Sequence, residues 1–491
     1  MQDQVGRPEE AVPPGTEVSR RQFLKLAGIA GAAVVVGGGL GGVLAACGGG
    51  TTATSATTAS SVGGAPTTAV GASTTAASVA GKIKIGLITD FSIPQLVNNQ
   101  RVFEALIDGA NKRGGWDVGG SKYTLELIPL DGKSEAATSR SAVQRLVTQD
   151  KANVIFGDPM GGAWLSVTEE AKTLTILESM LANVFNPQHK YSFNISMLPV
   201  ETPVRVNYLP VYTGKQPKKW VGVSEDSIPG QSMLGVQTGI VKMLGYDFEA
   251  VSYPTGTSDF TAVATKVLTA NPDVCILGMT DTGLFQLMRS LRSASFPGIC
   301  LCPTEFLPGQ LSKIGKLTEL DGLITGCFPT ATDSPNAIAQ EQMADYVAKY
   351  GAWDDPDFMG GDIFYAYRAA VQKAGSIDAD AVSAVLAAGF ENDGPHGKAR
   401  MVTRPDAGVT DRTVCQVMEN LMATVSGGKL TNVQTVNLDD VAKYCAAAWS
   451  VPSGPPPGAA PGGAPGGAPP STAPGAAPSS APGAGTPPPS S

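Results

Sequence analysis

The stretch "KIKIGLIT" at residues 82–89 is the first part of the chain with the pattern of a buried β-strand. Ile83, Ile85 and Leu87 alternate along it, and Ile88 adds an apolar side chain on the opposite face. Alternation with a period of two predicts a strand, and apolar residues on both faces are typical of strands in parallel sheets that helices cover. The folded part of the chain therefore begins as an α/β architecture.

Strands and helices then alternate along the chain. Apolar residues recur at helical spacing from Val102 to Ala110, and the glycines of "RGG" (113–115) predict the end of that helix. Further strands are predicted at 123–131, 153–158, 173–179, 219–226, 248–253, 273–280 and 298–305, with helices at 134–150, 231–245, 260–270 and 282–293. This βαβα succession predicts parallel sheets covered by helices.

The loops after the strands are the expected place of a binding site. Ligands of parallel sheets bind beyond the carboxyl ends of the strands, where several loops meet at one edge. The loops in question lie at 90–95, 131–135, 157–163, 178–183, 225–230, 279–283 and 303–308.

Length and charge limit the number of lobes and the kinds of partner. The folded part, about residues 82–450, is too long for one ordinary core, which predicts two lobes. The chain has 35 Lys and Arg against 43 Asp and Glu, for a net charge of −8, and contains no basic block. Nucleic acid is therefore not an expected partner.

The N-terminal region has the pattern of an export signal. Arg20 and Arg21 stand side by side before a glycine-diluted apolar segment, Leu26 to Ala46. Adjacent arginines before an apolar segment indicate the twin-arginine route. The following "LAAC" resembles the lipobox of bacterial lipoproteins, which implies that Cys47 is acylated and becomes the new N-terminus. A transmembrane helix is the alternative, although about 21 residues would barely span a bilayer of ~30 Å.

Two segments have compositions that cannot form a packed core. Residues 47–81 are mostly Gly, Ser, Thr and Ala, and we expect a disordered tether there. Residues 451–491 are rich in Pro, Gly and Ala and carry no charge, and we expect a disordered tail. The signal would occupy residues 1–46. No second segment is apolar enough to span a membrane.

Cysteine and histidine usage leaves disulfides open and argues against a metal site. The six cysteines besides Cys47 are Cys275, Cys300, Cys302, Cys327, Cys415 and Cys445. An even number in an exported chain allows disulfides, but small buried thiols are an equally good interpretation. Cys300 and Cys302 would face the same side of a strand. His189 and His396 lack ligand-like spacing, so we expect no metal and no cofactor.

Five stretches resemble one family. They are "IKIGLITDFS" (83–92), "NKRGGWDVGG" (111–120), the run from 125 to 158 that ends in "ANVIFGD", "DIFYAYRAAVQKAG" (362–375) and "GPHGKARM" (394–401). Together they resemble the type I periplasmic binding proteins, the leucine/isoleucine/valine-binding group of ABC-transporter receptors. The resemblance covers nearly all of residues 82–450.

The resemblance implies two doubly wound, parallel-sheet α/β lobes joined by three hinge segments. The expected boundaries are 82–198 plus 330–392 for lobe 1 and 199–329 plus 393–450 for lobe 2, with hinges near 197–203, 326–332 and 390–397. A small molecule would bind between the lobes, and closure would favour a form that an ABC permease recognises.

The resemblance also implies ligand-binding residues in lobe 1. In the family, hydroxyls and backbone N–H groups after the third and fourth strands hold a ligand carboxylate. The matching residues are Gly161, Gly162, Ala163, Ser179 and Ala182. N–H groups at a helix start favour an anion, although the glycine pair is also typical of a tight turn. This chain lacks the family's serine in the first of these loops and its Gly-Ser pair after strand one.

In lobe 2 the implied site residues are Ile228, Asp281, Thr282 and Glu305. Glu305 is the sharpest candidate for a ligand amino group, since a carboxylate in a closed cleft favours a cation; a strand-end glutamate in solvent is the alternative. Trp164 would wall the pocket by stacking, but an aromatic residue early in a helix also suits a core.

These observations predict an extracytoplasmic, membrane-anchored solute-binding lipoprotein of an ABC importer, a monomer that binds an aromatic or apolar small molecule, or else an amino acid or amide. A surface sensor that presents a ligand to a membrane receptor needs the same two lobes and stays open. An enzyme is not expected, because no G-x-S-x-G stands between a strand and a helix and neither histidine lies beside a candidate serine.

Overall fold

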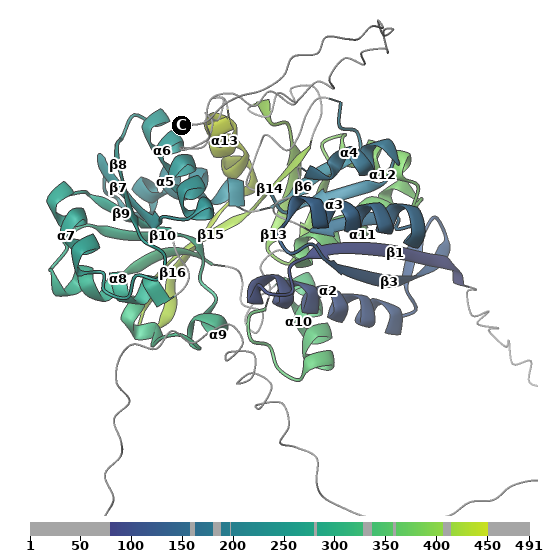
Figure 1. Cartoon of the computed structure of the whole chain (residues 1–491), viewed down its shortest axis with the longest axis horizontal. Coiled ribbons are helices and arrows are strands. Elements are labelled where there is room, and N and C mark those ends of the chain that lie inside the picture. The colour runs from purple at the N-terminus through teal and green to yellow at the C-terminus, as the bar shows by residue number, and fades with distance from the viewer. Residues whose placement is uncertain are drawn as a thin grey trace, which may run out of the picture. The chain divides into compact units, whose positions relative to one another are not determined.

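The computed structural model describes residues 79–157, 163–179, 188–196, 198–278, 282–327, 336–356, 360–405 and 414–449 (Figure 1). All of them belong to one compact unit, residues 75–491. The expected signal, the tether up to residue 78 and the tail lie outside the described residues, and the tether and tail assignments stay predictions. Within the described ranges, no helix has the length and apolarity needed to cross a membrane.

Lobe 1 is built on a nine-stranded sheet. Its strand order is β12 (Glu391–Gly394), β13 (Gly397–Val402), β14 (Cys415–Met418), β6 (Ser192–Ile195), β5 (Leu174–Leu177), β4 (Val154–Gly157), β1 (Val79–Thr89), β3 (Ser121–Asp131) and β2 (Trp116–Val118). Neighbouring strands from β14 to β3 are parallel, and the outer pairings are antiparallel.

Helices cover both faces of this sheet. Helices α2 (Pro94–Lys112), α11 (Gly360–Ala374) and α12 (Ala379–Leu386) share one core with Ile83, Ile85 and Leu87 of β1, and α10 (Ala337–Tyr350) packs on α2. Helices α3 (Ala136–Arg145) and α4 (Leu165–Glu170), with a π-helical turn (Leu146–Asp150), share the other core with Ile88. The apolar side chains of residues 82–89 therefore divide between the two faces of the sheet, as their alternation predicted.

Lobe 2 is built on a seven-stranded sheet. Its order is β16 (Lys429–Val436), β15 (Asn420–Ser426), β11 (Leu323–Cys327), β10 (Ile299–Glu305), β9 (Val274–Leu277), β7 (Lys219–Glu225) and β8 (Asp247–Tyr253). Helices α5 (Leu198–Thr213), α6 (Ile228–Met243) and α13 (Leu438–Trp449) share a core on one face. Helices α7 (Thr261–Ala270), α8 (Thr282–Ser293) and α9 (Pro308–Leu311), with a 3-10 turn (Leu317–Leu320), lie on the other.

Two element boundaries differ from the sequence prediction. Strand β1 begins at Val79 rather than Lys82, because the hairpin of β2 and β3 extends β3 to Ser121 and gives residues 79–81 a pairing partner. Helix α2 begins at Pro94, inside the expected loop. Proline suits the first helical turn, where its missing N–H needs no partner.

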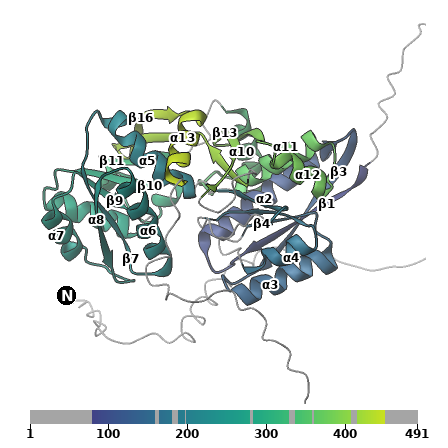
Figure 2. The same ribbon diagram turned by 90° about the horizontal axis from the view of Figure 1, so that it is seen from above.

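The chain passes between the two sheets three times, and the third passage corrects a predicted boundary. The first leads from β6 into α5, and the second from β11 to α10. Strands β12 to β14 belong to the lobe 1 sheet, because β14 pairs with β6 and β13 pairs with β14. The third passage is therefore at Glu419, between β14 and β15, and not near 390–397. Figures 1 and 2 both show β13 and α13 in the region where the elements of lobe 1 and lobe 2 meet.

The cysteines with described side chains remain thiols. They are Cys275, Cys300, Cys302, Cys415 and Cys445, and all are buried or half-buried. Cys300 and Cys302 pack against the same core, as their spacing predicted. Burial raises the pKa of the Cys275 and Cys445 thiols well above its usual value. These side chains therefore act as small apolar residues.

Replacement of two helical glycines by alanine should change the stability of the protein in opposite directions. A Cβ atom on Gly109 of α2 would lie 2.1 Å from the Asp345 carboxyl carbon, whereas one on Gly239 of α6 would meet nothing within 4 Å. Gly109→Ala would displace Asp345 from its 2.6 Å ion pair with Arg113 and should lower the free energy of unfolding in urea by about 1–3 kcal/mol. Gly239→Ala should raise it by about 0.5–1 kcal/mol. Equal effects of the two changes would contradict this packing of α2 on α10.

Candidate functional site

Polar residues gather where the strands of lobe 1 end. Asp90 follows β1, and Glu178 and Ser179 follow β5. The strands are parallel neighbours through β4, so their carboxyl ends lie at the same edge of the sheet. All three residues are buried, which means that their polar groups need partners.

Glu178 is held by a short hydrogen-bond relay. Asn99 of α2 donates from Nδ2 to Glu178 Oε1 at 2.7 Å, and its Oδ1 accepts the backbone N–H of Gly360, the first residue of α11, at 2.8 Å. Asn99 therefore joins the end of β5 to the starts of two helices. The Glu178 carboxylate is thus a buried and hydrogen-bonded polar group at the carboxyl edge of the sheet.

Asp90 holds the turn after β1 and leaves an aromatic ring in solvent. Its Oδ1 accepts the N–H of Ser92 at 2.8 Å and the Ser92 hydroxyl, and its Oδ2 accepts the Ser134 hydroxyl at 2.8 Å. These hydrogen bonds, from the Ser92 hydroxyl first, lower the pKa of Asp90. Phe91 between them is 49% exposed. The carboxyl edge therefore presents one half-exposed aromatic side chain on a turn that hydrogen bonds to Asp90 hold.

The lobe 1 residues that were predicted to hold a ligand carboxylate differ in their surroundings. Gly161, Gly162 and Ala182 lie outside the described residues. Ala163 is exposed, and its carbonyl accepts Arg140 Nη1 at 3.3 Å. Ser179 is buried, and its backbone N–H already donates to Asn194 Oδ1 at 2.8 Å.

Trp164 is a correction to the prediction. Its side chain has no exposed surface and packs in the core between α3, α4 and the sheet, with Ile155 and Leu165 among its neighbours. A ring that is enclosed by core side chains cannot present a face to a solute, so Trp164 supports the fold and not the pocket.

The structure also describes only some of the residues predicted for the lobe 2 side of the site. Thr282 is exposed at the start of α8, and Ile228 begins α6, but the Ile228 side chain and the whole of Asp281 lie outside the described part. Helix α6 starts with a serine cap, in which Ser227 Oγ accepts the N–H of Gly230 at 3.3 Å. A Cβ at Gly230 would lie 2.1 Å from the Glu225 carbonyl oxygen, so glycine allows this close approach.

Glu305 is not the solvent-exposed strand end of the alternative interpretation. It ends β10 and is 6% exposed, and it lies close enough to Glu201 on α5 to affect the Glu201 carboxyl group. Burial raises the pKa of Glu201 well above its usual value, and the nearby Glu305 carboxyl adds to the effect. Arg205, also on α5, acts in the opposite direction and lowers the pKa of Glu201.

Sequence reasoning did not single out Asn99, Glu178, Glu201 or Arg205. Glu178 lies in the expected loop 178–183, where a charged residue directly after an apolar strand was a usable signal. Glu201 and Arg205 stand four residues apart in the otherwise apolar "MLPVETPVRV". Such a pair inside an apolar helix is a sign of buried polar contacts.

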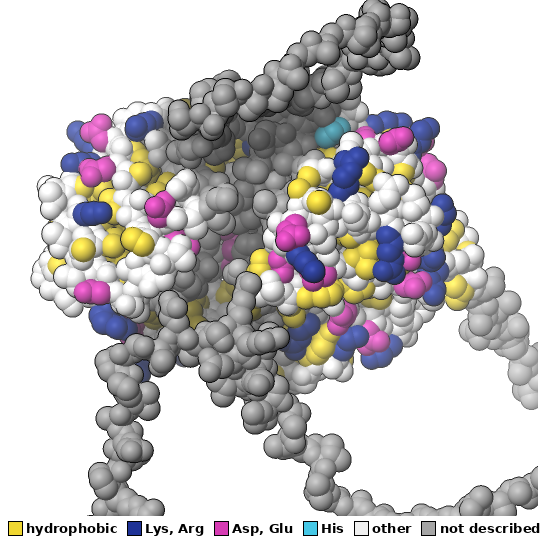
Figure 3. All heavy atoms as spheres, viewed as in Figure 1, with side chains coloured by type: hydrophobic (Ala, Val, Ile, Leu, Met, Phe, Trp, Pro, Cys, Tyr) yellow, Lys and Arg dark blue, Asp and Glu magenta, His cyan; other side chains and the backbone are white. Residues whose placement is uncertain are grey.

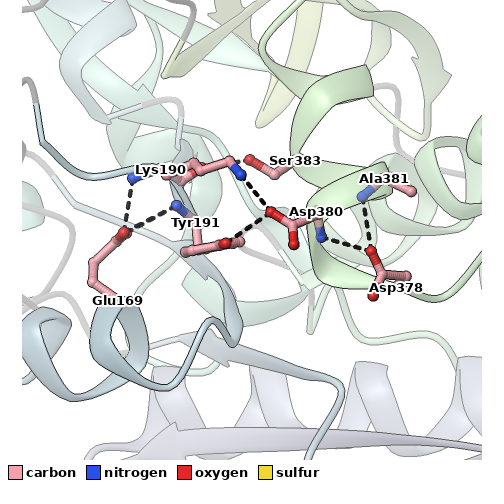
Figure 4. Close-up of polar contacts among 7 residues, drawn as sticks. All are labelled: Glu169, Lys190, Tyr191, Asp378, Asp380, Ala381 and Ser383. Atoms are coloured by element: carbon pink, nitrogen blue, oxygen red, sulfur yellow. Dashed lines mark hydrogen bonds and ion pairs between the residues drawn. The ribbon is translucent and has the colours of Figure 1, made fainter.

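A second polar network lies at the other edge of the lobe 1 sheet (Figure 4). Asp380 of α12 accepts the Tyr191 hydroxyl at 2.8 Å and pairs with Lys190, while Glu169 of α4 accepts the backbone N–H groups of Lys190 and Tyr191. Lys190 and Tyr191 directly precede β6, so they lie at its amino end. Their hydrogen bonds fasten α4 and α12 to the sheet. Over the described ranges, no cluster of His, Cys, Asp and Glu could hold a metal ion.

The face seen in Figure 3 carries Lys and Arg interspersed with Asp and Glu over its described residues. Ion pairs among the described residues include Arg289 with Glu319 at 2.6 Å and Lys313 with Asp354 at 2.8 Å. Such exposed pairs contribute little to stability. On this face the described residues form no continuous patch of one sign.

Comparison with known proteins gives a family. A family model described as periplasmic binding protein matches residues 82–419, and a model of twin-arginine translocation signal sequences matches residues 17–37. The chain belongs to the periplasmic binding protein family. The second match confirms the export signal predicted at Arg20 and Arg21. A periplasmic binding protein with this signal is exported to the extracytoplasmic space. A search of curated proteins finds no match.

Solved structures show the same fold. A leucine binding protein from Thermotoga maritima is 20% identical, with a TM-score of 0.56 over 73% of this chain and 99% of that one. A branched-chain amino acid transporter substrate-binding protein from Streptococcus pneumoniae, solved with isoleucine, is 17% identical, with a TM-score of 0.56 over 72% and 99%. An ABC-transporter solute-binding protein from Rhodopseudomonas palustris, solved with 3,4-dihydroxybenzoic acid, is 20% identical, with a TM-score of 0.53 over 71% and 95%. The two-lobed, parallel-sheet fold is thus confirmed.

The Asn99 relay leads to a stability prediction. Asn99→Ala removes the donor to Glu178 and the acceptor of the Gly360 N–H, and buried groups left without partners cost about 1–3 kcal/mol. We expect the free energy of unfolding in urea to fall by that amount. Among the described residues, the neighbouring Gln100 side chain bonds to Glu104 on the same helix, so Gln100→Ala should change the free energy of unfolding by less than about 0.5 kcal/mol. Similar losses in both variants would contradict the relay.

Proposed function

We propose that this periplasmic binding protein is the solute-binding component of an ABC importer and that it captures a small organic solute between the carboxyl edges of its two sheets. The observation that carries the proposal is the fold itself: two parallel sheets that the chain joins by three passages. Separate lobes with such connections can close on a ligand by hinge motion, and a permease can recognise the closed form.

A direct contact between the lobes supports closure. Helix α9, directly after β10, meets the segment after α10: Gly309 N–H donates to Asp355 Oδ2, Gln310 Nε2 donates to the Asp354 carbonyl at 2.6 Å, and Lys313 pairs with Asp354. These bonds join elements of different lobes. They are few and partly exposed, as expected for a contact that forms and breaks as the lobes move.

The solute class that we favour is an aromatic or apolar small molecule, with an amino acid or amide as the second candidate. Phe91 offers an exposed ring at the carboxyl edge of β1, and rings stack on rings with specific geometry. Gly161, Gly162, Ala163, Ser179 and Ala182 remain candidates for a ligand carboxylate. Ile228, Asp281, Thr282 and Glu305 remain candidates on the side of lobe 2, and Glu305 would meet an amino group. The Rhodopseudomonas and Streptococcus structures hold ligands of these two classes.

We also propose that Cys47 carries a lipid anchor. The twin-arginine match covers residues 17–37, and "LAAC" ends at Cys47 ten residues later. Two acyl chains suffice for stable attachment. Residues 47–78 would then tether the folded part, a monomer, at the extracytoplasmic face of the membrane. A ligand-presenting sensor remains the second candidate, because it needs the same lobes and anchor.

A solute screen tests the proposed function. Mature protein is heated with a panel of benzoate-type acids, branched-chain amino acids and amides, and a solute at 100 times its Kd should add ~2.7 kcal/mol to the free energy of unfolding. We expect a benzoate-type acid to raise the Tm most. A rise in Tm with amino acids alone would make them, and not aromatic acids, the favoured solute class. No rise in Tm with benzoate-type acids, amino acids or amides would contradict the proposal.

A variant of Phe91 tests whether its ring takes part in solute binding. If its ring stacks on the solute, Phe91→Ala should weaken calorimetric binding of the best aromatic solute by about tenfold, since an aromatic pair contributes about 0.5–1.5 kcal/mol beyond its buried area. Val433 on β16 is equally exposed, at 50%, so Val433→Ala is the control and should leave Kd unchanged. Unchanged binding by Phe91→Ala would remove this ring from the site.

The anchor is tested by fractionation of cells. Cys47→Ala should move the protein from the membrane fraction to the soluble extracytoplasmic fraction and abolish the mass increase due to acyl chains. Ser55→Ala, within the same tether, should behave as wild type. Retention of Cys47→Ala in the membrane would favour an uncleaved transmembrane segment instead.

A further inference from the structure

The segment between α10 and α11 of lobe 1 holds helix α9 of lobe 2. The Gly309 N–H donates to Asp355 Oδ2 at 2.5 Å. Gln310 Nε2 donates to the Asp354 carbonyl at 2.6 Å, and Lys313 Nζ lies 2.8 Å from Asp354 Oδ2. In Figure 1, α9 and α10 lie at the same end of the two lobes. We call the contact made by these five residues the clasp.

Asp355 is held in a conformation that serves the clasp. Its φ angle of 51° lies in the left-handed region, which residues other than glycine rarely adopt. The residue is buried, and its Oδ1 accepts the indole N–H of Trp353 at 2.9 Å. Contacts within lobe 1 therefore fix the carboxylate whose other oxygen binds Gly309. Strained residues persist where the surrounding structure imposes them, often at sites that close on a ligand.

An aromatic stack fastens the lobe 1 side of the clasp to α2. The Trp353 ring lies 5.4 Å from that of Tyr346, which lies 4.9 Å from that of Tyr350. The Arg101 guanidinium of α2 lies 5.3 Å from the Tyr346 ring centre and 4.4 Å from the Tyr350 ring centre. The Tyr346 hydroxyl donates to Asp354 Oδ1 at 3.4 Å. The stack thus links α2 to both aspartates of the clasp.

The lobe 2 side of the clasp depends on a glycine. A Cβ atom on Gly309 would lie 2.7 Å from the carbonyl carbon and oxygen of Asp354 and 2.8 Å from Asp355 Oδ2. Such distances are too short for a real side chain, so only glycine lets α9 approach the lobe 1 backbone this closely. A Cβ atom on Gly239, also in lobe 2, would meet nothing within 4 Å.

The clasp differs from the contacts at the chain passages. At the third passage, Asn420 of β15 donates to the Met418 carbonyl of β14 at 3.2 Å and accepts a hydrogen bond from Arg205 of α5. These groups lie beside a chain connection, so movement of the lobes leaves them close together. The clasp joins residues that are 41 to 46 positions apart in sequence, and separation of the lobes breaks it. It therefore distinguishes a closed form from an open one.

The clasp adjoins the polar groups at the carboxyl edges of both sheets. Helix α9 follows β10, which ends at Glu305. On the other side, the clasp segment leads into α11, whose first residue, Gly360, donates its N–H to Asn99, the residue that holds Glu178. A solute between these groups is released when the lobes separate, and that movement has to break the clasp.

We propose that the clasp holds the two lobes together and sets the rate at which a captured solute leaves. Arg101 is a positioning residue, because it acts on Asp354 and Asp355 through the aromatic stack. That the clasp retains a solute rests on the proposed function, but the contact between the lobes needs no solute.

Hydrogen exchange of the Gly309 amide in the mature protein reports on the clasp without solute. Asp355→Asn keeps the left-handed backbone conformation, which asparagine tolerates, but leaves one acceptor oxygen for two donors. We expect protection of the Gly309 amide to fall about tenfold, since hydrogen bonds to charged groups are the stronger ones. The Phe306 amide, which bonds to the Gly326 carbonyl at 2.9 Å within lobe 2, is the internal control and should keep its protection.

A variant of Arg101 tests the aromatic stack. Arg101→Lys keeps the charge but loses the planar group that lies on the two tyrosine rings, and should lower protection of the Gly309 amide by about threefold. A structural role confined to lobe 1 would not change this amide of lobe 2. Arg145→Lys, in an exposed pair with Asp150, is the control and should match wild type.

Release kinetics test the consequence for the solute. Stopped-flow release is measured with benzoate or isoleucine, whichever raises the Tm in the solute screen. Gly309→Ala should raise the release rate about tenfold and leave the association rate within about twofold, because changes at a contact act mainly on dissociation. Gly239→Ala is the same substitution in the same lobe and should match wild type.

Two results would overturn the proposal. One is wild-type protection of the Gly309 amide in Asp355→Asn, or a fall that the Phe306 amide shares, because lobe 1 would then not hold α9. The other is an equal release rate in Gly309→Ala and Gly239→Ala, because the clasp would then not retain the solute. A failed solute screen would contradict the proposed function, and the exchange experiment would still decide whether the clasp joins the lobes.

Discussion

Burial of parallel strands on both faces is the constraint on which this structure depends. A strand such as β1 has apolar residues on both sides, so it needs helices above and below, and each lobe satisfies this need with its own pair of cores. Covered faces leave only the edges of a parallel sheet accessible. The carboxyl edge is where loops from several strands meet, and there the described structure concentrates Asp90, Glu178 and Glu305 among buried groups.

The same constraint makes the passages between sheets polar. Where the chain leaves one sheet for the next, backbone and side-chain groups are buried without a ladder to pair with. Asn420 satisfies the Met418 carbonyl at the third of these points. Within lobe 1, Asn99 does the same for the Gly360 N–H at the start of α11. These amides stabilise a particular arrangement of segments more than they stabilise the fold as a whole, which is the property that a hinged binding protein needs.

Much of the architecture was predictable because it depends on local patterns. The expected strands and helices within residues 82–305 are present, with ends shifted by a few residues except at the start of α2. The assignment of β12 to β14 was not predictable. A strand pattern shows that a strand exists but not which sheet it joins, and the short hairpin around "GPHG" would fit the edge of either lobe. Trp164 shows the same limit, since an aromatic residue early in a helix suits a core or a pocket equally until its neighbours are known.

The sequence by itself determined the export signal, the two-lobed α/β class and the loops in which a site would lie, because these follow from composition, period and spacing along the chain. Only the tertiary structure decided which charged residues are buried together. Glu201, Arg205, Glu305 and Asn420 are up to 219 residues apart, since they run from position 201 to position 420. Their pairing depends on long-range packing of α5 against β10, β11 and β15, and no local pattern along the chain records such contacts.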